Sequence, residues 1–272
     1  MKKFWQKYRK NRPASAALAV LAVIVFFSLF AGLIAPLENG IRQNPRVRLQ
    51  GPSREHIFGT DDHGRDLFTR IIHGGRISLL LGFGAAALSM AAAFVFGSIA
   101  GYAGGLADEI IMRIMDALLS IPYMLLTLTI VAALGPGVKN LFIAIVAAYI
   151  PNFTRIVRSV VLTITENDYI TAARVNGLGG AAIIRRHILR NAIGPIVVQT
   201  ALSVTGMILV SVGLSFIGLG VSPPVPEWGA MLSSSREFLR RAPHLMFFPA
   251  AAIVITALSL NLAADGIRDA LE

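Results

Sequence analysis

Six apolar runs, each long enough to cross a lipid bilayer, constrain this chain more than any other feature of its sequence. A membrane-spanning helix needs about 20 apolar residues, because the hydrocarbon core is about 30 Å thick. Lipid offers the backbone no hydrogen-bond partner, so such runs fold as α-helices. The runs cover residues 14–35, 77–101, 110–134, 141–164, 192–217 and 245–264. The sequence therefore predicts an all-α membrane protein with six transmembrane helices.

The composition agrees with lipid as the main solvent. Of the 272 residues, 55% are hydrophobic and 15% are charged, and the mean hydropathy is +0.66. A net charge of +10 in a soluble protein would suggest nucleic acid, but here the basic residues flank apolar runs. We therefore expect membrane lipids as partners and no nucleic acid. The chain contains no cysteine, which excludes disulfides, thiolate metal sites and cysteine nucleophiles.

The N-terminal segment predicts a first transmembrane helix whose N-terminus is cytoplasmic. Residues 1–13 carry six basic residues and no acidic one, and the apolar run that follows is longer than the roughly 7–15 residues of a signal peptide. Six crossings return the C-terminus to the cytoplasm. We expect residues 1–36 to form the N-terminus and first helix, 37–76 an extracytoplasmic connector, and 77–272 a five-helix core with a cytoplasmic loop at about 165–191.

Charge supports this orientation only in part. Arginines cluster around the proposed inner loop, as cytoplasmic segments prefer. The connector also holds many arginines, but acidic residues offset them. Charged residues lie near the cytoplasmic start of the third run: Asp108, Glu109, Arg113 and Asp116. Glu109 and Arg113 have the spacing of a helical ion pair, so we favour structural pairing over a transport role for this group.

Small and polar residues inside the runs predict a tight bundle. Gly97 and Gly101 have the spacing that allows two helices to approach closely. Pro122, Pro151, Pro195 and Pro249 lie within or near spans and predict bends. The polar residues Asn152, Gln199, Ser203 and Ser211 either line a translocation pathway or form hydrogen bonds between helices.

The loop at 165–191 reads as a helix, a glycine turn and a second helix. Asp168 is suited to capping the first helix, and Gly177 or Gly179 to ending it with a positive φ. Ala172 and Ala173 remove bulk from this helix, which lets another protein approach its backbone. We therefore expect a docking surface here, although a short amphipathic helix against the membrane would need no more.

This loop resembles the cytoplasmic EAA motif of a known family, the inner-membrane permease subunits of bacterial ABC importers for dipeptides, oligopeptides and nickel. Further stretches resemble signatures of the same family in the same order, and the resemblance covers nearly the whole chain. These stretches are residues 58–66, 76–79, 214–224, 227–229 and 261–271. The resemblance implies a type I importer (MetI-like) permease fold in the bacterial inner membrane.

The resemblance also implies a role for the loop as a coupling helix seated in an ATPase subunit. The residues that it assigns to this contact are Asp168, Tyr169, Thr171, Ala172, Ala173, Arg174, Gly177, Arg186 and His187. Two residues depart from the family pattern: Thr171 stands where Glu is usual, and Arg190 where Pro is usual. The missing carboxylate puts the contact made by Thr171 in doubt.

The implied partners are a second homologous permease, two ATP-binding-cassette ATPases and an extracytoplasmic substrate-binding protein. No Walker phosphate-binding loop occurs in the sequence, so we expect the chain to be non-catalytic and to bind no cofactor, with ATP and Mg²⁺ held by the ATPases.

Three other classes of protein come into consideration. A permease for nickel or a metal chelate shares the same motifs. In the connector, His56, Asp61, Asp62 and His63 carry groups that suit nickel, but they belong to a family signature, so we expect no metal site. A secondary transporter would show repeated halves and buried ion-binding residues. An intramembrane enzyme would need a nucleophile with its base, or a metal cluster, within its spans, and none appears in the sequence.

Overall fold

The computed structural model describes residues 2–271, and within them it is helical with no β-strand. The α-helices are α1 (Lys2–Lys10), α2 (Arg12–Leu29), α3 (Ala31–Ile34), α4 (Leu37–Ile41), α5 (Leu67–Leu79), α6 (Ala85–Ala103), α7 (Gly105–Leu119), α8 (Tyr123–Leu134), α9 (Val138–Thr165), α10 (Asp168–Val175), α11 (Gly180–Ile183), α12 (Leu189–Phe216), α13 (Trp228–Ser235) and α14 (His244–Leu271). Short 3-10 turns, η1 (Pro45–Val47) and η4 (Arg236–Phe238), and π-helical turns, η2 (Leu80–Gly84) and η3 (Ile184–Ile188), complete the set.

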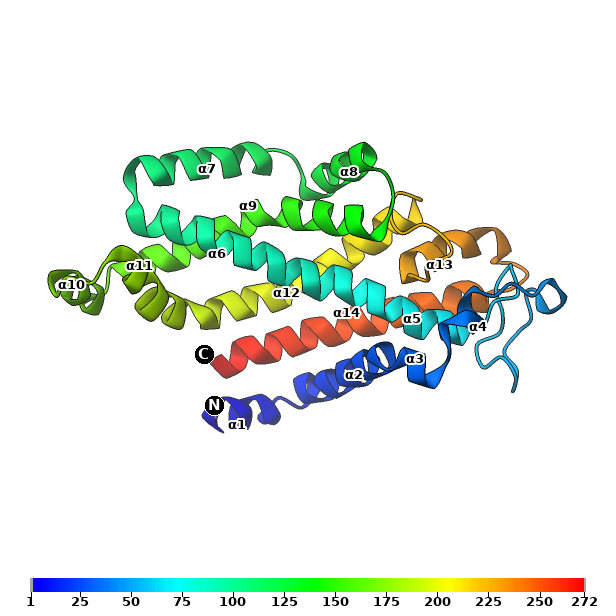
Figure 1. The fold of residues 1–272 in the computed structure, drawn as a ribbon. Coiled ribbons are helices and arrows are strands. Elements are labelled where there is room, and N and C mark those ends of the chain that lie inside the picture. The colour runs from blue at the N-terminus through cyan, green and yellow to red at the C-terminus, as the bar shows by residue number, and fades with distance from the viewer. Residues whose placement is uncertain (1, 272) are drawn as a thin grey trace.

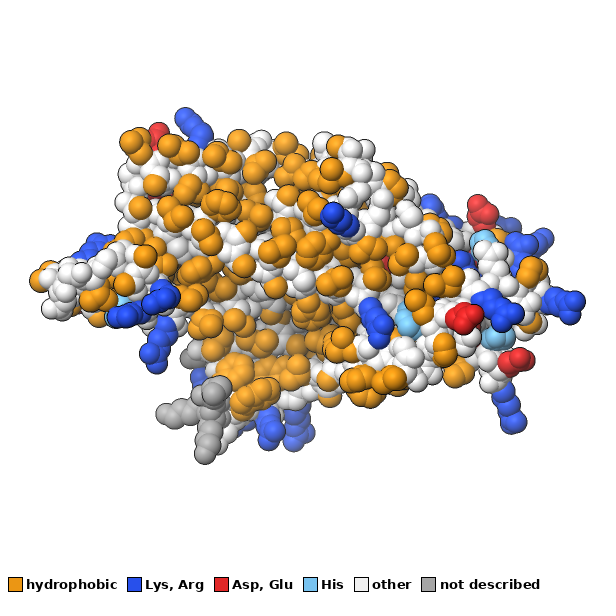
Figure 2. Space-filling view, in the orientation of Figure 1, with side chains coloured by type: hydrophobic (Ala, Val, Ile, Leu, Met, Phe, Trp, Pro, Cys, Tyr) orange, Lys and Arg blue, Asp and Glu red, His pale blue; other side chains and the backbone are white. Residues whose placement is uncertain are grey.

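Five helical segments are long and apolar enough to cross a membrane, and a bent pair brings the number to as many as six. The five are Arg12–Leu29, Leu67–Ala103, Val138–Thr165, Gly180–Phe216 and His244–Leu271. The long helices lie side by side, with α10 at one end of the bundle and the connector at the other (Figure 1). Apolar side chains cover the middle of the molecule, and most charged ones gather at its two ends (Figure 2). This distribution fits a multi-pass membrane protein.

The third predicted run is not one straight helix. It divides into α7 and α8, which meet at an angle of 84° across the break that contains Pro122. Proline has no backbone N–H and disfavours a helical conformation in the preceding residue, so a break here is expected. Pro151, Pro195 and Pro249, in contrast, lie inside the continuous helices α9, α12 and α14.

The second spanning segment begins earlier than the sequence predicts, at Leu67 instead of residue 77. Asp66 caps the N-terminus of α5 by accepting hydrogen bonds from the backbone N–H and the hydroxyl of Thr69, at 2.8 and 2.7 Å. The residues from Leu67 to Gly75 are largely buried, and α5 contacts α2 and α13. The end of the predicted connector is therefore part of the bundle.

Arg76 of α5 caps the C-terminal end of α2 through hydrogen bonds. Its guanidinium donates to the carbonyl of Ser28 at 2.7 Å and to that of Leu29. These carbonyls lie at the C-terminus of α2, where intrahelical partners are lacking and a positive charge is favourable.

The pair of helices with the most extensive contact is α6 and α9. A Cβ atom on Gly97 would lie 2.8 Å from the carbonyl oxygen of Thr154 and from Cβ of Val157. One on Gly101 would lie 3.0 Å from the carbonyl oxygen of Arg158. Both glycines therefore permit the close approach that their spacing predicts.

Replacing Gly97 by Ala should lower the thermal stability of the solubilised protein, because the added methyl group forces α6 away from α9, at a cost of about 1–3 kcal/mol. Gly194→Ala on α12 is the matched control, since no neighbouring atom lies within 4 Å of the place that its Cβ would take. Alanine is intrinsically the better helix residue by about 0.5–1 kcal/mol, so this control should be neutral or stabilising. Equal melting temperatures for the two variants would contradict the close contact.

Candidate functional site

The loop between α9 and α12 carries the candidate docking surface. It projects beyond the other helices at one end of the bundle (Figure 1). The helix–turn–helix order predicted from sequence is confirmed, with α10 over Asp168–Val175, then a turn, then α11 and η3. The turn and the start of α10 show why the sequence folds this way.

Gly177 ends α10 with φ of +77°, as predicted, whereas the alternative, Gly179, is extended with φ of −67°. The backbone N–H of Leu178 donates to the carbonyl of Ala173 at 3.1 Å, and that of Gly177 to the carbonyl of Arg174 at 3.0 Å. This pair of bonds defines a Schellman motif, in which a left-handed glycine satisfies the last carbonyls of a helix.

The predicted cap at Asp168 is displaced by one residue. Asn167 occupies the N-cap position with an extended backbone, and Asp168 is the first helical residue. The amide of Asn167 donates to the carbonyls of Thr163 and Ile164, both at 3.0 Å, and so completes the end of α9 instead. Asp168 still favours the helix, because its charge lies near the positive end of the helix dipole.

The two alanines of the loop differ in exposure, which corrects the prediction that both belong to the docking face. Ala172 is exposed, but Ala173 is only 7% exposed. Ala173 and Ile170 are three residues apart and share the face of α10 that joins the hydrophobic core. Ala173 therefore serves to seat α10 closely on the bundle.

The outward face of α10 is made by the exposed residues Asp168, Tyr169, Thr171, Ala172, Arg174, Val175 and Gly177. Val175 is 83% exposed. Val175 was not among the predicted contact residues, although its position four residues after Thr171 places both on one helix face.

Two aromatic contacts tie the loop to its surroundings. The Arg174 guanidinium carbon lies 4.9 Å from the ring centre of Tyr102, which belongs to α6. The ring of Tyr169 lies 6.3 Å from that of His187 in η3. Arg186 in the same turn is exposed, and His187 is partly buried. The loop therefore contacts the end of α6 at Tyr102, and α10 contacts η3, which leads into α12.

The four polar residues proposed for a pathway differ in exposure. Asn152 is exposed on α9, whereas Gln199 and Ser203 are partly buried on α12, where the Ser203 hydroxyl donates to the Gln199 carbonyl at 2.9 Å. Ser211 is fully buried. It continues the buried face of α12 with Val204 and Met207, so it does not reach a surface of this subunit.

The predicted ion pair between Glu109 and Arg113 is not among those formed within residues 2–271. Instead, α7 pairs with α9: Asp116 with Arg155 and Asp108 with Arg158. Arg158 of α9 makes a bidentate contact with Asp108 of α7, in which Nε and Nη2 donate to the two carboxylate oxygens.

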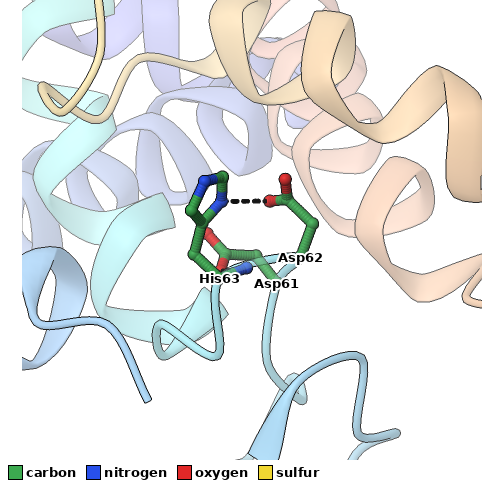
Figure 3. A group of neighbouring side chains, drawn as sticks. All are labelled: Asp61, Asp62 and His63. Carbon is green, nitrogen blue, oxygen red and sulfur yellow. Dashed lines mark hydrogen bonds and ion pairs between the residues drawn. The ribbon is translucent and has the colours of Figure 1, made fainter. Parts of the chain in front are cut away.

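In the connector, Asp61, Asp62 and His63 hold potential metal-ligating atoms within 4.8 Å of one another (Figure 3). Arg65, however, donates from Nε to Asp61 at 2.6 Å, and Arg70 lies 3.4 Å from the same carboxylate. Both guanidinium groups are buried and would repel a cation. The donor set therefore suits a structural ion-pair cluster that folds the connector, and it does not fit a metal centre.

Glu227 is the first residue of the signature at residues 227–229. It is fully buried, and its carboxylate accepts hydrogen bonds from the N–H of Ala230 at 2.8 Å and from the Ser78 hydroxyl at 3.2 Å. Burial raises the pKa of this carboxyl, although these hydrogen bonds oppose the shift. Trp228 beside it donates from its ring to the Ile71 carbonyl at 2.9 Å. The signature therefore joins α13 to α5.

Comparison with known proteins adds a family to this geometry. The family described as "Binding-protein-dependent transport system inner membrane component" matches residues 93–272, and "N-terminal TM domain of oligopeptide transport permease C" matches residues 1–52. The first match includes α10 and the whole loop around it. The second includes α1 to α4 and part of the connector.

Full-length relatives give the same result. The dipeptide transport system permease protein DppC of Alkalihalophilus pseudofirmus is 43% identical, over 98% of this chain and 88% of the relative. The di/tripeptide transport system permease protein DppC of Pseudomonas aeruginosa is 39% identical, over 100% and 91%. The glutathione transport system permease protein GsiD of Escherichia coli is 39% identical, over 99% and 89%. The chain therefore belongs to the family of inner-membrane components of binding-protein-dependent transport systems.

Proposed function

We propose that this chain is a permease subunit of an ATP-driven importer of short peptides, and that it forms half of the translocation pathway. The observation that carries the proposal is identity of 37–43% along nearly the whole chain with permeases named for dipeptide, di/tripeptide or glutathione transport. Glutathione is itself a tripeptide, so these names share one class of substrate. A permease for nickel or a metal chelate is the alternative, which these relatives do not favour.

The working assembly contains a second, homologous permease, two ATPase subunits and an extracytoplasmic substrate-binding protein. ATP and Mg²⁺ bind to the ATPases, because the sequence of this chain has no phosphate-binding loop with a Walker lysine. The chain lies in the bacterial inner membrane with both termini in the cytoplasm. The connector and α13 then face outward, and α10 faces the ATPases.

Coupling depends on α10. Its outward residues Tyr169, Thr171, Ala172 and Val175 seat in a cleft of the ATPase, while Ile170 and Ala173 hold it against the bundle. When the ATPases close on ATP, α10 moves as one body, because the Schellman turn and the Tyr102 contact fix its orientation. The energy of ATP binding changes the bundle only if α10 contacts the ATPase differently in the two states.

The purified chain should hydrolyse no ATP, and the complex reconstituted with its ATPase and binding-protein partners should take up labelled dipeptide in an ATP-dependent manner. Measuring phosphate release and uptake in proteoliposomes tests both statements. Nickel uptake without dipeptide uptake would replace the proposed substrate by its alternative. Hydrolysis by the isolated, uncontaminated chain would refute the permease assignment itself.

Single-cysteine labelling tests the orientation, and the absence of native cysteine makes it clean. Ser53→Cys, exposed in the connector, should react with an impermeant thiol reagent in intact cells. Asn176→Cys, exposed after α10, should react only after the membrane is opened. The reverse pattern would invert the proposed topology.

Ala172→Glu and Ala173→Glu should fail in different ways. Ala172 is exposed, so its variant should accumulate normally but lose peptide-stimulated ATP hydrolysis by about tenfold, the effect of about 1.4 kcal/mol of lost docking free energy. Ala173 is buried, so its variant should melt at a lower temperature, because a buried carboxylate without a partner is costly.

Ala181→Glu, which adds the same charge at an exposed position of α11, serves as the control and should retain activity. Normal hydrolysis and uptake by Ala172→Glu would show that α10 does not couple the subunits through its outward face.

A further inference from the structure

Six charged side chains line a trough of about 500 Å³ between α7 and α9. Three are acidic and three are basic, so the trough carries no net charge: Asp108, Glu109 and Asp116, with Arg113, Arg155 and Arg158. The volume falls within the range of small-molecule sites, about 300–1,000 Å³. None of these residues belongs to the docking face of α10.

Only some of the charged residues of the trough form ion pairs with each other. Arg155 pairs with Asp116 at 2.6 Å, yet their side chains remain 56% and 53% exposed. Glu109 and Arg113 are both exposed, and neither takes part in an ion pair within residues 2–271. An exposed pair such as Asp116 and Arg155 contributes little stability, and it is free to exchange partners with a charged ligand.

A polar stripe on α9 continues the trough. Asn152, Arg155, Ser159 and Thr163 are all exposed, and their spacings of three and four residues place them on one helix face. The residues between them that point the other way, Phe153, Val157 and Val161, are fully buried. α9 is apolar enough to span a membrane, and a helix face that contacts lipid would be apolar. This polar stripe is therefore unsuited to contact with lipid.

The position of Arg155 along α9 indicates whether the stripe faces lipid, or water and protein. Arg155 is ten residues before the end of α9 at Thr165, so it lies about 15 Å inside the helix at 1.5 Å per residue. A helix of 28 residues is about 42 Å long, so Arg155 falls within a hydrocarbon core of about 30 Å that is centred on α9. A charged side chain that faces lipid is costly there, by about 2.5–3.5 kcal/mol at the bilayer centre on lenient scales. The trough must therefore face water or protein in the assembled transporter.

We propose that the trough lines the water-filled part of the pathway and binds short zwitterionic peptides, an inference that rests on the proposed peptide importer. Arg113 and Arg155 face the C-terminal carboxylate of the peptide, and Glu109 and Asp116 face its ammonium group. A neutral trough with separate charges of both signs matches a ligand of the same kind, and the match to both termini confers selectivity for free-ended peptides. The weak Asp116–Arg155 pair re-forms when the peptide leaves.

Water access and ligand protection test the proposal in the complete importer in proteoliposomes. Ser159→Cys should react with a small cationic methanethiosulfonate at least tenfold faster than Leu258→Cys, a control at a 58% exposed apolar position on α14. Dialanine in excess should slow the reaction of Ser159→Cys at least threefold. Dialanine with acetylated and amidated ends should not. Adding Arg113→Gln should abolish the protection, although Arg113 has no ion pair to lose within residues 2–271.

Equal reactivity of Ser159→Cys and Leu258→Cys would overturn the proposal, since the stripe would then face lipid or a closed protein interface. Equal effects of the free and blocked peptides, including no effect, would overturn it as well. Uptake of labelled dialanine by the Ser159→Cys complex distinguishes failure of the trough assignment from failure of the proposed peptide import. If uptake is normal without protection, only the trough assignment falls. If the wild-type complex takes up no dialanine, the proposed peptide import fails, and the trough assignment falls with it.

Discussion

The close contact between α6 and α9 is the constraint on which the rest of the structure depends. Lipid supplies no hydrophobic force that drives helices together, so packing at glycine must hold them. Gly97 and Gly101 bring α6 against the backbone of Thr154 and Arg158. This contact fixes the face that α9 turns toward α7. It also places Tyr102, near the end of α6, beside α10.

Most of the fold could be predicted from sequence, because an apolar run that matches the thickness of a membrane identifies a spanning helix. The glycine spacing, the Gly177 turn and the order of elements in the loop were predicted for the same local reasons. The sequence predicted a bend at Pro122, but not that its angle is as large as 84°, nor that α5 begins at Leu67. The early start of α5 depends on tertiary contacts, namely the burial of its first turns, and on its capping by Asp66.

The sites were predicted less completely, because a residue's type does not say which way it faces. Ala172 and Ala173 are identical in sequence terms, yet one is exposed and the other buried. Ser211 looked like a pathway residue and lies on the buried face of α12. The pairing of Asp116 with Arg155 joins residues 39 positions apart, which no local spacing rule reaches. A helix-face analysis of α9 would have grouped Asn152 with Ser159.

The continuous segment Leu67–Ala103 joins the two ends of the molecule. Its 37 residues, at 1.5 Å each, make a rod of about 55 Å, from the connector to the contact between Tyr102 and Arg174. In such a rod a tilt of about 10° at one end displaces the other by about 10 Å. The π-helical turn η2 is the irregular point along it and the natural place for flexing. A tilt therefore passes along the full length of this one element only while η2 stays straight, and a bend at η2 lets α5 and α6 tilt separately.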